Sequence, residues 1–410
     1  MINISRRDAL RVGGISVFGA MFLGSCGKEA GVAPFQLNTL SDEFRNNRIA
    51  FYKKLRDDNP VVITDQGIAL ISRYADVQAA ALDTETFSSG GKLNNPARPK
   101  MNTMDPPDHG MYVAMMNSAF DKKYQDSLES DLRTLARSLV TKAAERTQFD
   151  LMVDVLTPYM FGATGIILGL NDEQLVELEY IGKRAQRQGA EPAESPSPTE
   201  RSDALFLSVL ADRRAKPGND HVSALLAVGS DGGRALTEAE LLEYLFIFIN
   251  GTGITAVAAI GNGVELLARH PEQRAKLVAD PSLIPNAFKE MNRLEGPTHE
   301  STRITTREVT VAGVTLPANT PVFLMWGAAD LDERQFASPE EFDISRDGSQ
   351  SLAMGIGEHF CYGGYLARLE ARIFFEELLA VMPNFTLSAP AVRIMSTWSW
   401  GFESIPVSIA

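Results

Sequence analysis

A glycine-rich segment around one cysteine, directly before a helical pattern, constrains the fold of this chain more than any other feature. The segment covers residues 354–364, and after it Leu366, Leu369 and Ile373 fall on one face of a helix. Cys361 therefore precedes a helix N-terminus, where the helix dipole and free N–H groups favour a thiolate over a thiol. Glycines on both sides allow backbone donors to approach the sulfur, as a metal-bound thiolate requires.

The alternative interpretation of a lone cysteine is an inert buried side chain, which is the more common case. The chain has two cysteines, Cys26 and Cys361, and they are so far apart that each is interpreted from its own surroundings. The glycine pattern and the helix that follows favour a metal ligand for Cys361.

This segment resembles the signature of the cytochrome P-450 family, F-x-G-x-G-x-H/R-x-C-x-G before a helix. The matching residues are Gly355, Gly357, His359, Cys361 and Gly363. Met354 stands where the family has phenylalanine, a ring that packs near the sulfur, so the departure bears on redox potential more than on ligation. The resemblance implies that the Cys361 thiolate is the axial ligand of haem b (heme b, iron protoporphyrin IX).

Further matches lie before the cysteine. Glu290 and Arg293 form the family's E-x-x-R pair, and their spacing places both side chains on one helix face. Such a pair is weak by itself, because exposed Glu/Arg pairs are common. The resemblance implies that the pair locks the cysteine loop, and that Arg303, His109 and His359 bind the haem propionates. A histidine after two prolines, as His109 is, is equally typical of a surface residue at a helix start.

The longest helical pattern runs over residues 241–269 and is apolar nearly all round at 245–249, which predicts a buried helix. Each glycine inside it costs about 1 kcal/mol relative to alanine, so we expect a bulky group close to its backbone. The resemblance aligns residues 251–255 with the family's A-G-x-D/E-T and implies that Thr255 assists dioxygen activation. Ile254 replaces the acid and cannot carry a proton. The alternative for Thr255 is a hydroxyl bonded to its own helix backbone.

The helical turn after His109 carries less positive charge than the same turn in family members. Arginines that family members use for a propionate and for docking an acidic ferredoxin are here Met111 and Val113, which weakens electrostatic steering of an acidic donor. The whole chain, with 39 Lys and Arg against 52 Asp and Glu, has a formal charge of −13. That balance argues against general nucleic-acid binding.

The rest of the chain favours helices with small sheets. A helix is predicted at 43–58, and short strands at 61–64, 68–71, 309–311 and 314–316. Residues 88–103 and 189–198 have the composition of loops. No internal repeat and no apolar run of about 20 residues occurs, so a membrane-spanning helix is not expected. We predict a mainly α protein with small β-sheets, a single large helix-rich domain at 33–410, and, from the resemblance, the cytochrome P-450 fold.

Residues 1–32 are predicted to be a leader. Arg6 and Arg7 precede an apolar run at 12–23 and then the small residues before Cys26. The paired arginines resemble a twin-arginine export signal, and the residues at Cys26 resemble a lipobox. We therefore expect export to the periplasm, with a membrane surface as partner if Cys26 is acylated. The alternatives are a misassigned start codon or an attached leader on a cytoplasmic protein.

The expected function is a haem-thiolate monooxygenase that inserts one oxygen atom from dioxygen into an apolar organic substrate. The partners would be that small substrate and a ferredoxin or reductase, or else peroxide. Two alternatives stay open: a peroxide-driven peroxygenase, and a non-catalytic exported haem-binding or sensing protein. An apolar roof over the substrate is expected from Phe246, Phe248, Ile249 and Ile254. Further walls are expected from the 88–103 loop, a lid at 185–200, and residues 298–302 and 397–400, with His299 and Glu300 either as polar contacts or facing solvent.

Overall fold

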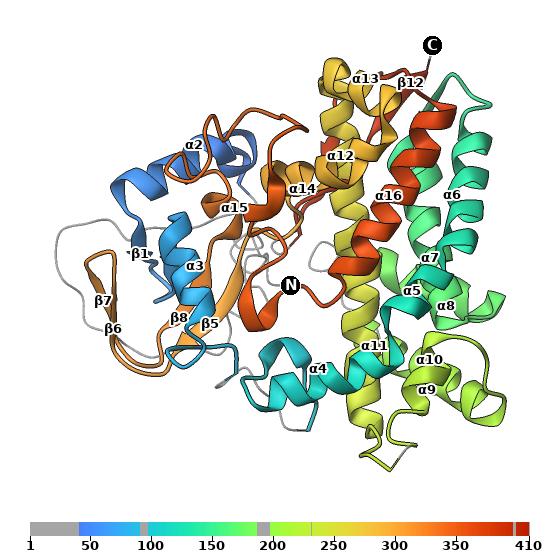
Figure 1. Ribbon diagram of the computed structural model, residues 1–410, viewed down its shortest axis with the longest axis horizontal. Helices are drawn as coiled ribbons and strands as arrows, with labels where there is room; N and C mark the ends of the chain where they lie inside the picture. The colour runs from blue at the N-terminus through green and yellow to red at the C-terminus, as the bar shows by residue number, and fades with distance from the viewer. Residues whose placement is uncertain (1–40, 91–96, 187–196, 231, 397–398, 410) are drawn as a thin grey trace, which may run out of the picture.

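The long apolar segment forms one continuous helical rod through the centre of the molecule (Figure 1). It consists of α11 (Glu238–Asn250), a wider π-helical turn η5 (Gly251–Thr255) and α12 (Ala256–Arg269). Thr237 begins it, because its side chain accepts a hydrogen bond from the N–H of Glu240 in a capping box. The helix is confirmed, whereas the π turn at its glycines was not predicted.

The computed structural model describes residues 41–90, 97–186, 197–230, 232–396 and 399–409. The predicted leader at 1–32, with Cys26, lies outside these residues, as does most of the predicted lid. Within the described ranges, the rod over 238–269 is the one helix long and apolar enough to cross a membrane, and 67% of its most apolar window is buried inside the protein. That burial is typical of the core helix of a globular fold.

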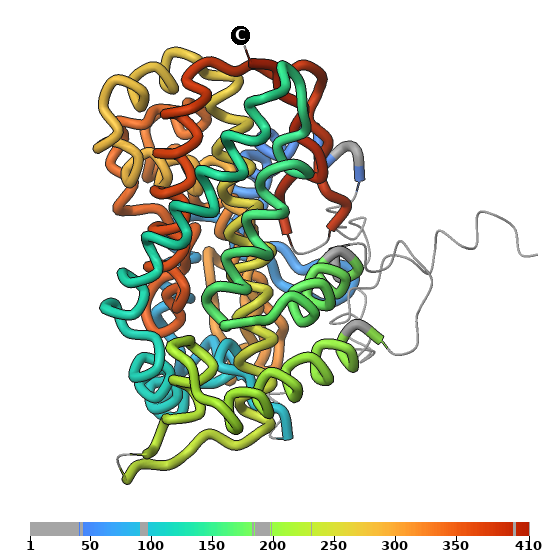
Figure 2. Tube along the Cα trace, turned by 90° about the vertical axis from the view of Figure 1, so that its right-hand side faces the viewer, coloured from blue at the N-terminus to red at the C-terminus, as the bar shows by residue number. Residues whose placement is uncertain are grey.

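Four helices around the central rod form most of the helical half of the molecule, and α6 lies beside α7 (Figure 2). They are α6 (Glu129–Ala143), α7 (Thr157–Leu168), α14 (Ile284–Glu295) and α16 (Gly364–Val381). In α6 the buried residues Leu132, Ala136, Val140 and Ala143 recur at helical spacing, so one stripe of the helix faces the core.

The other helical elements surround this core. The longer ones are α2 (Asp42–Asp58), α3 (Tyr74–Leu82), α4 (Asp108–Ala119), α5 (Lys122–Ser127), α8 (Asp172–Gln186), α9 (Pro198–Ala215), α10 (His221–Leu226) and α13 (Pro271–Ala279). The single turns are α15 (Trp326–Ala329), η3 (Met101–Thr103), η4 (Met152–Leu156), η6 (Pro281–Leu283), η7 (Gly348–Gln350) and η8 (Gly357–His359). The helix predicted at 43–58 is confirmed as α2.

A five-stranded sheet forms the other half of the molecule, at the left of Figure 1. Its order is β1 (Val61–Ile63), β2 (Ala69–Ile71), β8 (Pro321–Leu324), β5 (Ser301–Thr305) and β3 (Phe87–Ser88), with β2 parallel to β8 and the other pairs antiparallel. The pairing of β5 with β8 places Arg303 opposite Val322 near the middle of the sheet.

The smaller sheets complete a mainly α fold. They are β4 (Gln148–Asp150), β12 (Pro406–Ile409) and β9 (Phe385–Leu387) in one sheet, β10 (Val392–Arg393) with β11 (Phe402–Ser404) in another, and the hairpin of β6 (Val309–Val311) and β7 (Val314–Leu316). The hairpin turn has positive φ at Ala312 (47°) and Gly313 (82°), which suits the twist of two strands joined by two residues. The predicted hairpin is confirmed.

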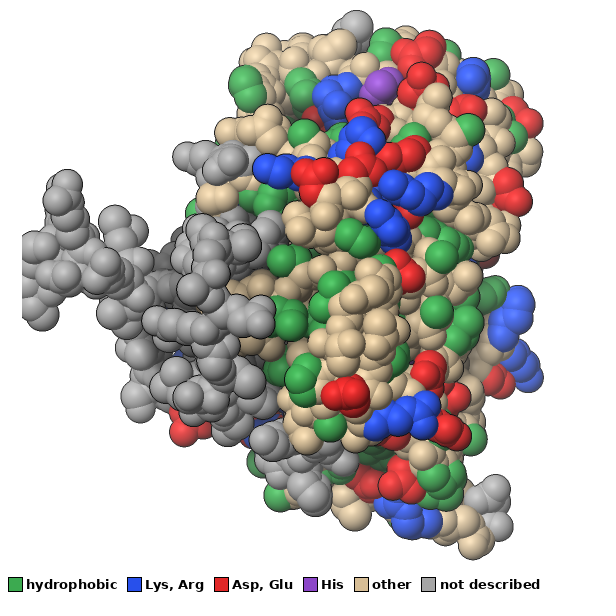
Figure 3. Space-filling model, turned by 90° about the vertical axis from the view of Figure 1, so that its left-hand side faces the viewer, with side chains coloured by type: hydrophobic (Ala, Val, Ile, Leu, Met, Phe, Trp, Pro, Cys, Tyr) green, Lys and Arg blue, Asp and Glu red, His purple; other side chains and the backbone are tan. Residues whose placement is uncertain are grey.

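Acidic and basic side chains are interspersed on the face shown in Figure 3. Ion pairs occur among the described residues, such as Lys53 with Asp57 at 2.7 Å and with Glu333 at 2.8 Å. Exposed ion pairs of this kind each contribute little to stability.

Candidate active site

The cysteine loop, residues 354–364, has a backbone shape that demands two of the predicted glycines. Gly355 and Gly357 have φ of 71° and 70°, the left-handed region that favours glycine. The N–H of Cys361 donates to the carbonyl of Met354 at 2.8 Å and closes the loop. Gly363 has an ordinary φ of −78°, but a Cβ there would meet no atom within 4 Å, so its small size leaves space open beside the loop.

The Cys361 thiol lies three residues before α16, as predicted, but burial acts against its thiolate form. Cys361 has an exposed surface, yet protein surrounds most of the thiol and this desolvation raises its pKa. A hydrogen bond from Gly363 and the charge of Arg368 act in the opposite direction and are outweighed. A metal ion bound at Cys361 would deprotonate the coordinating thiol outright.

Three basic side chains from separate elements meet at one place. Arg303 lies on β5, His109 in the first turn of α4 and His359 at the end of η8, with the two imidazole centroids 4.2 Å apart. His109 is 5% exposed, so the surface alternative for it is wrong, and its Nδ1 lies 2.8 Å from Oε1 of Glu358. Burial, followed by the charges of Arg303 and His109, lowers the pKa of His359 to about 4.

Two buried nitrogen atoms in this cluster have no hydrogen-bond partner among the described residues. They are Nε of Arg303 and Nε2 of His359. Arg303 uses Nη1 to donate to its neighbour's carbonyl, Thr302 O, at 2.8 Å. A buried polar nitrogen without a hydrogen-bond partner is costly even with the charges of Asp105 and Glu358 nearby, so the cluster is suited to a ligand with hydrogen-bond acceptors, such as a carboxylate.

The residues present fit a haem group. Besides the thiol and the unpartnered donors, Gly251 in the central rod is exposed, and a Cβ there would meet no atom within 4 Å. The helix therefore leaves room beside its backbone, as expected for a helix that a bulky group approaches. Cys361 would hold the iron, and Arg303, His109 and His359 would hold the propionates.

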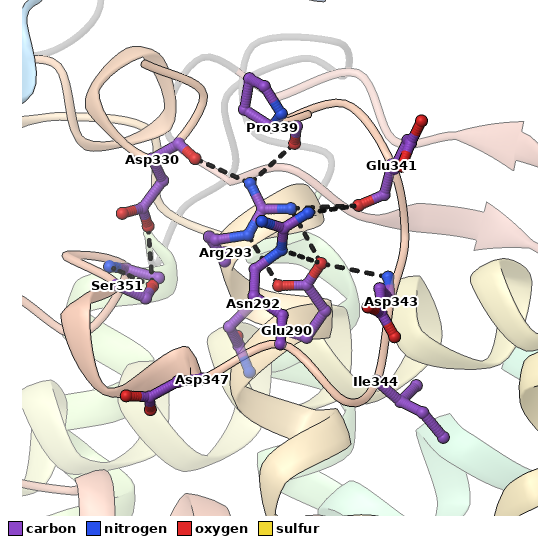
Figure 4. Close-up of polar contacts among 12 residues, drawn as sticks. Glu290, Asn292, Arg293, Asp330, Pro339, Glu341, Asp343, Ile344, Asp347 and Ser351 are labelled. Atoms are coloured by element: carbon purple, nitrogen blue, oxygen red, sulfur yellow. Dashed lines mark hydrogen bonds and ion pairs between the residues drawn. The ribbon is translucent and has the colours of Figure 1, made fainter. Parts of the chain in front are cut away.

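Glu290 and Arg293 form a fully buried ion pair on α14 (Figure 4). Arg293 also donates to the carbonyls of Asp330 and Pro339, while Glu290 accepts from Arg346 at 3.1 Å. The hydrogen-bond partners of the pair lie in residues 330–346, outside the cysteine loop that the resemblance expects it to lock. The link is indirect: the Asp330 carboxylate accepts from the N–H of Leu352, two residues before the loop.

The Thr255 hydroxyl makes the backbone bond that was the alternative interpretation. It donates to the carbonyl of Gly251 at 2.6 Å, and the residue is half-buried. Thr252, one turn away, donates to Phe248 O at 3.0 Å. Ile254 is 7% exposed, so the residue in place of the acid points its apolar side chain into packed protein.

Several expected substrate contacts lie elsewhere. Phe248 is 7% exposed and packs on Phe120 and His221, so it belongs to the core and not to a roof. His299 is 7% exposed and contacts Tyr52, with 2.9 Å from its Nδ1 to the tyrosine oxygen, so it does not face solvent. Burial raises the pKa of Glu300 to about 7. Residues 397–398 and most of the 185–200 lid lie outside the described ranges.

Two buried clusters were missed by the sequence analysis. The Glu295 carboxylate accepts hydrogen bonds from Arg48, Arg393 and Trp400. Trp400 in turn packs against His299. Tyr244 and His221 bond to each other near the cysteine loop. No spacing signal could have found either cluster, because their members come from helices and strands that only the fold brings together.

The fold and this site define a helix-rich haem protein with a cysteine thiolate as the iron ligand. The family model described as Cytochrome P450 matches residues 108–400. The chain is 30% identical to a steroid C26-monooxygenase of Mycobacterium tuberculosis, covering 87% of this chain and 92% of that protein. It is 31% identical to a vitamin D(3) 25-hydroxylase of Pseudonocardia autotrophica, covering 91% of this chain and 96% of that protein. The chain belongs to the cytochrome P450 family.

A solved structure agrees with this assignment. CYP109E1 from Bacillus megaterium, in complex with corticosterone, matches with a TM-score of 0.82, 25% identity, and coverage of 90% of this chain and all of that one. The protein is thus a haem b oxidoreductase of the monooxygenase type that acts on small organic substrates with electrons from a redox partner.

Proposed function

We propose that this protein is a monooxygenase for a medium-sized apolar substrate of the sterol or secosteroid class, with haem b held by Cys361, Arg303, His109 and His359. The observation that carries the site assignment is the pair of unpartnered buried donors, Nε of Arg303 and Nε2 of His359, beside a cysteine that precedes α16. Two propionate carboxylates would accept hydrogen bonds at these two positions.

Thiolate-ligated haem supplies dioxygen activation, because the sulfur donates electron density that favours O–O cleavage. The chain's own residues then decide how protons arrive. The Thr255 proton is engaged with Gly251 O, which leaves the hydroxyl oxygen as an acceptor for a water molecule. Ile254 excludes a carboxylate from its side of the rod, so water beside Thr255 would carry the protons.

The sterol class rests on the named relatives. The steroid C26-monooxygenase and vitamin D(3) 25-hydroxylase each align over more than four-fifths of this chain. Phe246 and Ile249 on α11 are half-buried and would offer apolar contact. The test is a titration of the purified haem protein with corticosterone and with vitamin D3, monitored by the absorbance change that accompanies loss of water from the iron. Saturable changes with either support the proposal; a response only to a small charged control such as benzoate contradicts it.

The electron donor is proposed to dock through apolar contacts more than through charge. Between Asp108 and Ala119, α4 has no lysine or arginine, and Met111 on it is 62% exposed. Phe360, next to the proposed ligand, is 49% exposed. Raising the salt concentration should therefore slow the reduction of this protein by its donor only slightly. The same salt would strongly slow reduction in a system where an acidic ferredoxin docks on a basic face. Peroxide-driven turnover is the second candidate, and the missing acid at Ile254 favours it.

Export is a separate proposal from the leader at 1–32. The twin-arginine route carries folded cargo, which suits a protein that acquires haem in the cytoplasm. Changing Arg6 and Arg7 together to lysine should hold the protein in the cytoplasm, as measured by cell fractionation. Intact, unprocessed wild-type chain in the cytoplasm would end this proposal. Acylation of Cys26 stays a prediction that mass spectrometry of the mature N-terminus can decide.

A further inference from the structure

A chain of three side chains leads from the cysteine loop into the interior. Tyr362 follows Cys361 directly, and its ring centroid lies 6.3 Å from that of Tyr244 on α11, with the ring planes at 79°. The Tyr244 oxygen lies 2.8 Å from Nε2 of His221, the first residue of α10. Tyr244 and His221 are 3% and 0% exposed, so water does not surround this pair.

The second ring nitrogen of His221 fixes where the protons are. Nδ1 lies 3.2 Å from the carbonyl oxygen of Ala119, which can only accept a hydrogen bond. Nδ1 therefore carries the hydrogen, Nε2 has the free lone pair, and the Tyr244 hydroxyl is the donor. Burial lowers the pKa of His221 to about 4, so the imidazole is neutral and free to accept a proton from the tyrosine.

This geometry is what one-electron oxidation of a phenol needs. Removing an electron from tyrosine makes the phenolic proton strongly acidic, so a base within hydrogen-bond distance makes the oxidation much easier. The imidazolium that forms would have Asp220 nearby, whose negative charge favours the protonated ring. Phe120 packs on His221 with ring centroids 4.3 Å apart and keeps the pair dry.

We propose that Tyr244 and His221 form a proton-coupled oxidation site, connected to the haem-thiolate site through Tyr362, that removes oxidising equivalents when no substrate uses them. The oxidant is hydrogen peroxide, which takes up two electrons and two protons at the haem-thiolate site and leaves as two molecules of water. One electron passes from Tyr244 by way of the Tyr362 ring to that oxidant, the O–H bond of Tyr244 breaks, and its proton moves to Nε2 of His221. The products are a neutral tyrosyl radical and an imidazolium. Ascorbate, an external reductant that releases one electron and one proton at each turn, restores the phenol while the proton returns from His221. Two such turns consume one molecule of peroxide and supply both of its electrons and both of its protons.

The replacement of the acid by Ile254 explains why this protein would need the Tyr244–His221 oxidation site. Without an acid beside Thr255, proton delivery and substrate oxidation are expected to be poorly matched, and unused oxidant would attack the site itself. The inference requires the haem-thiolate site, and it does not depend on the sterol substrate, the donor or export. The competing explanation is structural: a buried tyrosine and a buried histidine each need a partner, and they supply one to each other.

The experiment mixes substrate-free haem protein with hydrogen peroxide and freezes it within milliseconds for electron paramagnetic resonance. Tyr244→Phe should lower the tyrosyl signal at least fivefold and speed haem bleaching several-fold. His221→Gln separates the two explanations, because its amide can donate to Ala119 O and accept from Tyr244 but cannot take up the proton; it should also lose the signal. Tyr159→Phe is the matched control, since Tyr159 is also buried, at 1% exposed. It packs on Phe374 and contacts none of the three side chains of the proposed path.

Each variant is first checked for folding by thermal melting and for thiolate ligation by the absorbance of its ferrous carbon monoxide complex. A wild-type signal in Tyr244→Phe, or a full signal in His221→Gln with unchanged bleaching, overturns the proposal. Loss of the signal in Tyr159→Phe as well would place the radical elsewhere and would equally overturn it.

Discussion

Arg293 donates two hydrogen bonds to Glu290, from Nε at 2.7 Å and from Nη2 at 2.8 Å, and neither side chain has any exposed surface. Backbone carbonyls of Asp330 and Pro339 accept from the remaining donors of Arg293 (Figure 4). Arg346 donates to Glu290, so the buried pair is well satisfied. Removal of one partner would leave the other charged and buried.

Arg293→Ala should therefore cost about 3–5 kcal/mol of folding stability, the typical price of stranding one member of a buried pair. Arg293→Lys keeps the charge but loses the bidentate contact, so its free energy of unfolding should lie between those of the wild type and the alanine variant. Chemical denaturation of the haem-loaded protein measures both. Lys53→Ala, which breaks exposed ion pairs on α2, is the control and should melt close to wild type. Equal losses for Arg293→Ala and Lys53→Ala would contradict the prediction.

Cys361→Ser should bind haem weakly or not at all, and any ferrous carbon monoxide complex should lack the red-shifted Soret band of thiolate ligation. The reason is that serine cannot supply the polarizable thiolate sulfur. Optical spectra and haem quantification provide the measurement. A spectrum unchanged from wild type would show that another residue holds the iron.

Arg303→Leu should weaken haem retention about tenfold or more, because it removes a charge-assisted hydrogen bond worth roughly 1.5–3 kcal/mol. Arg307→Leu is the matched control: Arg307 is exposed and donates to the Thr86 hydroxyl at 2.7 Å. Haem transfer to apomyoglobin gives the off-rate of both variants. Identical off-rates for the two would remove Arg303 from the proposed propionate site.

Glu370→Gln should stabilise the protein at pH 8 and leave it little changed at pH 4. Burial raises the pKa of Glu370 on α16 from 4.5 to about 8, so the folded state holds a proton that the unfolded state releases. Stability from this group is full below pH 4.5 and is lost as pH rises toward 8, by roughly 1.4 kcal/mol per unit of pKa difference. Denaturation at several pH values gives the free energy of unfolding as a function of pH, and this free energy should depend less on pH in the variant. The same pH dependence in both proteins would show that Glu370 does not titrate in this range.

Ile254→Glu should raise product formed per NADPH and lower product formed per peroxide, because it restores a titratable group one residue before Thr255. Ile254→Gln has similar size without an acid and is the control for packing, since Ile254 is buried. Product yields with a ferredoxin system and with peroxide are compared for all three proteins. Tight NADPH coupling already present in wild type would contradict the peroxide-driven alternative.

Local patterns determined much of this protein. The glycines at 355 and 357 stand where φ is positive, the hairpin at Ala312 and Gly313 has the expected turn, and the apolar rod is buried. These features depend on neighbours within a few residues, so sequence spacing carries them. The tertiary structure alone decided that Glu290 and Arg293 hold residues 330–346, that His299 lies in the core, and that His221 bonds to Tyr244. Contacts between distant segments depend on how helices and sheet pack together, and no local period in the chain encodes that packing.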